Sequence, residues 1–129
     1  MTRPADLRYA STHEWVRVQG DVATIGITDF AVEQLSDLAF IDLPDAGAKC
    51  KKGARFGEIE STKAVSDLLA PVTGEIIEVN TEVVENLQYI SSSPYERGWL
   101  VRVRMSNPAE LEGLLNAEAY ETHVQAEQH

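Results

Sequence analysis

Alternating apolar and polar positions along the chain predict a protein built mainly of short β-strands. Residues 13–18 and 22–27 are two β-rich runs, and the short Gln19-Gly20-Asp21 segment between them predicts a hairpin. Further strands are predicted, separated by turn-forming Pro, Gly or hydroxyl residues, at 39–43, 54–60, 64–69, 75–79 and 98–105. This arrangement favours a small sandwich or flattened barrel.

Helical signals are fewer. Thr28 or Asp29 can cap a short helix that ends near residue 35. Residues 80–93 mix a partly helical spacing with a Ser-rich, Pro-containing stretch, which predicts a loop with a helical turn.

A stronger helix start lies near the C-terminus. Asn107 is a good cap, Pro108 suits the first helical position, and Glu110 can reach back to the cap amide. This helix is expected to bury a stripe of leucines, Leu111, Leu114 and Leu115. A second short helix is expected at 117–124, followed by a tail that frays.

One lysine is set apart between two predicted strands. Three lysines cluster at 49–52, whereas Lys63 is isolated and has acidic residues on both sides. Ser61 and Thr62 interrupt the apolar pattern before Lys63, and hydroxyl side chains favour a tight reversal because they hydrogen-bond nearby backbone groups. Lys63 is therefore predicted to stand at or beside a hairpin tip.

The composition narrows the possible partners. The chain has 129 residues and a formal net charge of -10, which repels nucleic acid and anionic membrane surfaces. The single cysteine, Cys50, suits a reducing compartment and excludes a multi-cysteine metal site. No apolar run is long enough for a membrane span, and the N-terminus lacks the apolar core of a signal peptide.

The sequence offers poor candidates for catalysis. The three histidines are scattered, which predicts no metal centre and no catalytic base, and Cys50 is more often an inert loop residue than a nucleophile. Glu58 and Glu60 share a strand face, where such pairs are usually solvated. Lys63 has two readings: an ordinary exposed lysine, or a lysine open to covalent modification because its neighbours Thr62 and Ala64 are small.

The residues around Lys63 resemble the lipoyl-attachment hairpin of the H proteins of the glycine cleavage system. The resemblance covers 60–67 and 70–75, and further likeness at His13-Glu14-Trp15, 20–29 and 98–100 extends it over about residues 9–120. Biotin carriers have a similar hairpin, but they place Met on both sides of the lysine.

The resemblance implies a single lipoyl-carrier domain over residues 1–129, with the core at about 9–120 and peripheral termini. The implied fold is a mostly β barrel-sandwich hybrid of the lipoyl and biotinyl-carrier (hammerhead) type. Lys63 would carry lipoate in amide linkage. The residues that support its hairpin would be Glu60, Ser61, Thr62, Ala64 and Gly74. In this family the loaded arm folds into a cleft, whose positions match Glu14, Ile27, Leu35 and Asp67.

The implied function is that of a non-catalytic, monomeric shuttle in glycine catabolism. Its partners would be a pyridoxal-phosphate glycine decarboxylase, a tetrahydrofolate-dependent aminomethyltransferase, dihydrolipoyl dehydrogenase and lipoate-attaching enzymes. The expected location is the bacterial cytoplasm, or the mitochondrial matrix for a mature eukaryotic chain. Two alternatives remain open: a relay that donates lipoyl or octanoyl groups to other apoproteins, and a binding module whose Lys63 stays bare.

Overall fold

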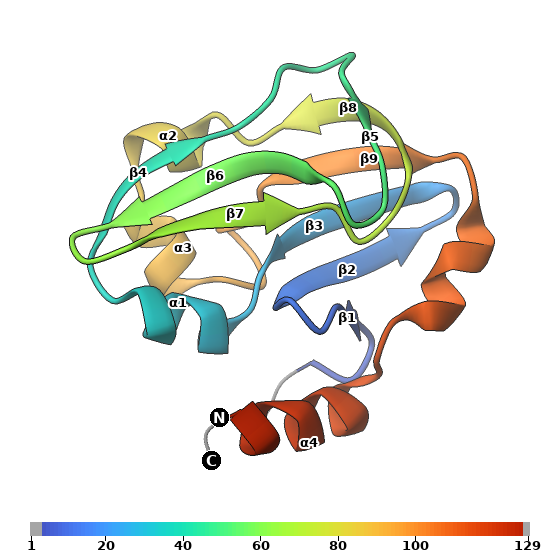
Figure 1. Ribbon diagram of the computed structural model, residues 1–129. Coiled ribbons are helices and arrows are strands. Elements are labelled where there is room, and N and C mark those ends of the chain that lie inside the picture. The colour runs from blue at the N-terminus through green and yellow to red at the C-terminus, as the bar shows by residue number, and fades with distance from the viewer. Residues whose placement is uncertain (1–3, 128–129) are drawn as a thin grey trace.

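Two antiparallel β-sheets form the body of the computed structural model, which describes residues 4–127 (Figure 1). The larger sheet has the strand order β1-β2-β3-β9-β8-β5 and the smaller sheet has the order β4-β6-β7. The strands are β1 (Arg8–Tyr9), β2 (Glu14–Gln19), β3 (Val22–Ile27), β4 (Leu38–Asp42), β5 (Lys49–Cys50), β6 (Arg55–Ser61), β7 (Val65–Leu69), β8 (Gly74–Val79) and β9 (Val101–Met105). Within the described residues the two sheets do not close into a barrel, and the mostly β prediction is confirmed.

The helices are short and lie around the edges of the sheets (Figure 1). They are α1 (Asp29–Leu35), α2 (Glu82–Glu85), α3 (Gln88–Ser92), a 3-10 helix η1 (Pro108–Gly113) and α4 (Ala117–Glu127). The predicted cap of α1 is confirmed, because the Thr28 side chain accepts a hydrogen bond from the Ala31 amide. In the part of the chain that is described, each helix is too short or too polar to cross a bilayer.

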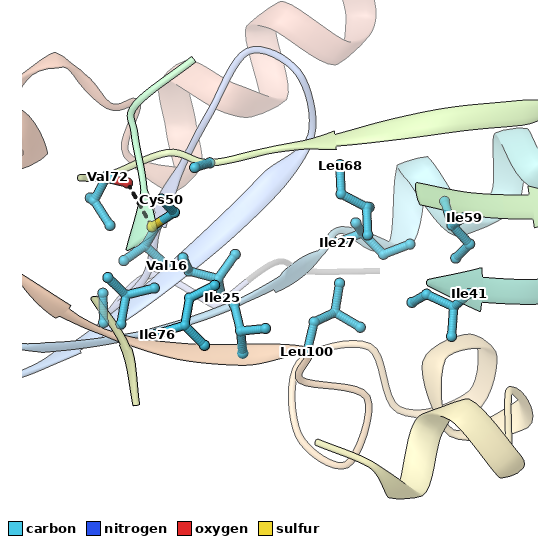
Figure 2. Packing of buried hydrophobic residues seen from close by; sticks show 14 of the residues in the cluster. Val16, Ile25, Ile27, Ile41, Cys50, Ile59, Leu68, Val72, Ile76 and Leu100 are labelled. Carbon is cyan, nitrogen blue, oxygen red and sulfur yellow. Dashed lines mark hydrogen bonds between the residues drawn. The ribbon is translucent and has the colours of Figure 1, made fainter. Parts of the chain in front are cut away.

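The main hydrophobic core lies between the two sheets. Figure 2 shows Ile27 of the larger sheet beside Leu68 of the smaller sheet, while Val16, Ile25 and Ile76 of the larger sheet group near Cys50 and Val72 in the same core. The Cys50 thiol is buried there and donates a hydrogen bond to the Val72 carbonyl at 3.4 Å. This agrees with the expectation of an inert cysteine.

A second, smaller core joins the two ends of the chain. Tyr120 of α4 stacks on Tyr9 of β1, with ring centroids 4.8 Å apart, and both side chains are buried. Trp15 is buried in the same cluster and donates a hydrogen bond to the Pro94 carbonyl at 2.9 Å. These contacts hold α4 against β1, as seen in Figure 1.

The segment after β9 corrects the predicted helix start. Asn107 makes no side-chain cap hydrogen bond, and the segment forms a 3-10 helix without a fully buried residue. Glu110 instead accepts hydrogen bonds from the Thr73 amide at 2.7 Å and the Thr73 hydroxyl at 2.8 Å. The leucines expected to be buried are only half-buried: Leu111, Leu114 and Leu115. A distant partner for Glu110 outweighs the local capping pattern.

Three smaller expectations also change. The strand predicted at 98–105 begins only at Val101, and Trp99 lies outside it with the Arg102 guanidinium 3.9 Å above its ring. Cys50, expected in a loop, forms a short strand with Lys49. The loop predicted at 80–93 contains two short helices.

Candidate functional site

Lys63 lies at the tip of the hairpin that joins β6 to β7, as predicted. The tip is held by the largely buried Ser61, whose hydroxyl accepts hydrogen bonds from the Lys63 amide at 3.3 Å and the Ala64 amide at 3.1 Å. The Ser61 amide also donates to the Ala64 carbonyl at 2.8 Å, and the Thr62 amide donates to the Asp37 carbonyl at 2.9 Å. The backbone is therefore fixed without the lysine side chain.

The Lys63 side chain is exposed, as are those of its neighbours Thr62 and Ala64. Among residues 4–127 no ion pair involves Lys63, although acidic side chains lie nearby in the sequence. An exposed amine on a fixed backbone, between two small residues, is accessible to another protein. Lipoate in amide linkage fits this position.

Beside the tip, the outer face of the smaller sheet carries exposed apolar side chains. Phe40 of β4 and Val65 of β7 are both paired with Glu60 of β6, so the three residues form one row on one face. The exposed fractions are 50% for Phe40 and 60% for Val65. We call this row, Phe40, Glu60 and Val65, the tip row.

A pocket of about 190 Å³ opens between β2, β3, α1 and β7. We call it the Glu14 pocket. Its lining includes all four residues matched to the arm cleft: Glu14, Ile27, Leu35 and Asp67. Further lining side chains were not identified from the sequence: Thr12, His13, Phe30, Ala31, Gln34, Ile59, Ser66, Leu68 and Glu127. Phe30 and Leu68 were recognisable only as apolar positions, because nothing in their pattern distinguishes a pocket wall from a core.

Glu14 is a buried carboxyl group inside this pocket, with 2% of its surface exposed. Its carboxyl accepts hydrogen bonds from the Thr12 hydroxyl and from the Leu69 amide, the latter at 3.3 Å. Burial raises the pKa of Glu14 to about 7, although both hydrogen bonds favour the charged form. The contact with Leu69 links β2 of the larger sheet to β7 of the smaller sheet.

Asp67 differs from Glu14 although both line the pocket. The Asp67 side chain is 61% exposed, and its carboxylate accepts a hydrogen bond from the Arg55 guanidinium at 3.2 Å. Arg55 also pairs with Glu58 at 3.0 Å. Asp67 is therefore already paired in a solvated network, and Glu14 is the less solvated acid of the pocket.

Gly74 is not near the lysine. It begins β8, paired with Cys50 and Met105, whereas Lys63 lies at the opposite end of β7 (Figure 1). A Cβ atom at Gly74 would lie 2.0 Å from the Arg104 carbonyl oxygen, so glycine allows β8 to approach β9. Gly74 thus has a packing role, and the expectation that it supports the hairpin directly is wrong.

Comparison with known proteins gives consistent matches over nearly the whole chain. Residues 7–127 match the family described as Glycine cleavage H-protein. The chain is 49% identical over 122 residues to the glycine cleavage system H protein of Synechococcus sp. (strain JA-2-3B'a(2-13)), covering 95% of each chain. It is 50% identical over 125 residues to that of Methylacidiphilum infernorum (isolate V4), covering 97% of this chain and 98% of the other.

A solved structure agrees with these matches. The crystal structure of a glycine cleavage system H protein from Mycobacterium marinum is similar with a TM-score of 0.86 and 42% sequence identity. The similarity covers 93% of this chain and 97% of that chain. The two-sheet arrangement described above is therefore the arrangement of a solved relative.

Proposed function

The chain belongs to the glycine cleavage H-protein family, whose members carry lipoate, and on that premise we propose that Lys63 is the lipoylated residue. In this proposal the protein is a non-catalytic, monomeric carrier that forms a single domain. It takes the aminomethyl group derived from glycine to the enzyme that consumes it. The observation that carries the proposal is an exposed lysine on the same hairpin whose strand β7 lines a pocket with a buried carboxyl group.

The distance between tip and pocket supports this role. Asp67 follows Lys63 by four positions along the hairpin, and a strand rises ~3.3 Å per residue, so the separation is roughly 13 Å. A lysine side chain extended by a lipoyl group can span this length. The same tether can therefore point outward to a partner or turn back along β7 to the pocket.

The lining of the pocket suits such a tether. Ile27, Leu35 and Leu68 provide apolar walls for a hydrocarbon chain, and their side chains are already buried in the fold. When attached, the lipoyl group supplies the redox-active sulfur chemistry, and the protein supplies binding and orientation. In this proposal Glu14 holds the terminal amine of the arm, because a desolvated carboxylate is a strong hydrogen-bond acceptor for an ammonium group.

The partners follow from the carrier role. They are a glycine decarboxylase that uses pyridoxal phosphate, an aminomethyltransferase that uses tetrahydrofolate, dihydrolipoyl dehydrogenase and a lipoate-attaching enzyme. The net charge of -10 favours docking to basic surfaces. The tip row lies beside the lysine that each partner must reach. Its exposed apolar side chains can be buried by a docking partner, while the surrounding surface is polar.

Intact mass tests the attachment site. The protein is co-expressed with a lipoate-attaching enzyme and lipoate, alongside Lys63→Ala and a second exposed lysine variant, Lys51→Ala. One lipoyl increment is expected in the wild type and in Lys51→Ala, and none in Lys63→Ala. An increment that survives Lys63→Ala would overturn the proposal.

Glycine-dependent turnover then tests the carrier role. The lipoylated protein is combined with the other three enzymes of the system, and NADH formation is followed. Turnover that depends on the lipoylated chain supports the shuttle. Absence of turnover, together with transfer of lipoyl groups to other apoproteins, would instead support the relay.

A further inference from the structure

We propose that His13, His123 and Glu127 form a binding site for one divalent transition-metal ion. One donor atom from each of the three side chains lies within 4.8 Å of the other two. The Glu127 carboxylate joins both rings, with one oxygen 2.9 Å from His13 Nε2 and the other 2.9 Å from His123 Nε2. We call these three residues the histidine tripod.

The tripod is assembled from two distant parts of the chain. His123 and Glu127 lie four residues apart on α4, which places both on one helical face. His13 precedes β2 and is brought to them by the stacking of Tyr120 on Tyr9. The histidines are far apart in the sequence, and their contact depends on this tertiary packing.

His13 is held in place before any ion binds. Its backbone has a φ of 80°, which is uncommon for a residue other than glycine. Its amide donates to the Ala10 carbonyl at 2.9 Å and its carbonyl accepts from the Thr28 amide at 3.0 Å. Its ring lies 4.8 Å from that of Phe30. A preorganised ligand of this kind loses little freedom on binding a metal.

The second nitrogen of His13 has the partner that a metal-binding imidazole needs. His13 Nδ1 lies 2.7 Å from the hydroxyl of Tyr120, and that hydroxyl is buried and also contacts the Thr28 hydroxyl at 2.7 Å. When Nδ1 carries its proton toward Tyr120, the lone pair of Nε2 faces the Glu127 carboxylate. A cation between these two groups removes their repulsion, and such outer contacts fix the ring of a metal ligand.

The geometry needs only a small adjustment. Zinc–nitrogen and zinc–oxygen bonds of about 2.0–2.2 Å place neighbouring donors roughly 3.4 Å apart in a tetrahedral site. Donor atoms that now lie up to 4.8 Å apart must therefore approach by about 1.4 Å. His123 is 31% and Glu127 41% exposed by side chain, so both can rotate, whereas His13 is 16% exposed. His123 Nε2 must also give up its contact with the Ser11 carbonyl, now 2.9 Å.

The donor set indicates the class of ion. Two imidazoles and one carboxylate suit zinc, nickel or copper rather than calcium or magnesium, which prefer oxygen ligands. Three protein ligands leave at least one coordination position open. Because His13 and Glu127 also line the Glu14 pocket, the bound ion would sit at the rim of that pocket and tie α4 to the start of β2.

Calorimetric titration of the purified, unlipoylated protein with zinc sulfate tests the proposal. One ion per chain is expected with a dissociation constant in the micromolar range, and His123→Gln or Glu127→Gln should weaken binding at least tenfold. Replacing zinc with cobalt(II) should give visible absorption bands characteristic of imidazole coordination, and these should disappear in both variants. Lipoylation and glycine turnover do not enter this test, so its failure leaves the proposed function untouched.

Two matched variants separate the tripod from non-specific binding to an acidic protein. Glu118→Gln removes an exposed carboxylate from the same helix, and His129→Gln removes the remaining histidine; neither should change the affinity. Thermal unfolding should show a zinc-dependent rise of the midpoint that is absent in His123→Gln. Binding weaker than millimolar in the wild type, or equal loss of affinity in a control and a tripod variant, would overturn the site.

Discussion

The hairpin tip exposes its functional side chain to solvent, whereas the Glu14 pocket buries its own. At the tip, backbone groups are satisfied by the Ser61 side chain and the Lys63 side chain is left in solvent. In the pocket, the Glu14 side chain is enclosed and its carboxyl group accepts hydrogen bonds from Thr12 and from Leu69 of β7. Replacing Lys63 should therefore leave the stability of the fold unchanged, whereas replacing Glu14 should alter it.

This difference has a physical cause. An exposed amine keeps its hydration, so neither its presence nor its removal changes the free energy of unfolding by much. A buried carboxyl group loses hydration, and its charged form is penalised. Substitutions that change one region at a time should therefore affect stability very differently at the tip and in the pocket.

The largest expected effect is on modification, from Lys63→Arg. The variant keeps the positive charge but cannot form the amide, so lipoylation should fall to zero. The free energy of unfolding should stay within about 0.5 kcal/mol of wild type, because the side chain is exposed. Intact mass and urea unfolding measure the two quantities. A substantial loss of stability would mean that the tip depends on its lysine after all.

The next effect is the pH dependence of stability that Glu14 introduces. The pKa of Glu14 is about 7 in the folded protein against an ordinary 4.5, so the folded state holds a proton that the unfolded state has released. Stability from this group is present below pH 4.5 and is lost as the pH rises to 7. The loss amounts to about 3 kcal/mol.

Glu14→Gln should remove this dependence. Relative to wild type, the stability gain of the variant should grow from about 1 kcal/mol at pH 5 to about 3 kcal/mol at pH 8, in urea unfolding followed at several pH values. Asp67→Asn is the matched control, since its carboxylate is 61% exposed. Parallel curves for wild type and Glu14→Gln would show that Glu14 is hydrated in solution.

A smaller effect is expected from Ser61→Ala. The variant loses the acceptor for the Lys63 and Ala64 amides, which should cost about 1 kcal/mol of stability because water can replace part of the contact. The rate of lipoylation should fall severalfold, since the tip becomes less ordered. Ser66→Ala, one strand position into β7, should change neither quantity. Lipoylation at the wild-type rate would mean that the tip needs no fixed backbone.

The smallest effect is expected from the tip row. Val65→Thr removes apolar surface that is 60% exposed, so stability should change by less than about 0.5 kcal/mol. If a lipoate-attaching enzyme covers this surface, its KM should rise by about fivefold, equivalent to ~1 kcal/mol of binding. Val84→Thr on α2, where the side chain is 45% exposed, serves as control. An equal KM for both variants would place the docking contact elsewhere.

Local features of the fold were predictable from the sequence. Strand period identified β2, β3 and β6, and the hydroxyl residues Ser61 and Thr62 identified the tip. These elements follow from interactions within a few residues. The predicted cap at Asn107 is wrong because the Glu110 carboxylate, expected to reach back to the cap amide, instead binds Thr73, which is distant in the sequence.

The residues of the Glu14 pocket and of the histidine tripod could not be predicted from local sequence patterns. Glu14 and Leu35 were named through a family resemblance and not through a pattern, since pocket walls and core residues have the same apolar spacing. The burial of Glu14 depends on the approach of β7 to β2, which no short motif records. His13 and His123 likewise come together only through the packing of α4, so their separation in sequence concealed the tripod.

Because β7 is an edge strand of the smaller sheet, its position affects self-association. Within the described residues β7 pairs with β6 alone, so one row of its backbone groups faces outward. An unpaired strand edge of this kind can pair with a strand from another molecule. The β7 edge is only five residues long, carries the charged Asp67, and has its Leu69 amide hydrogen-bonded to Glu14. These features protect the strand next to the lysine from the edge-to-edge pairing that leads to aggregates.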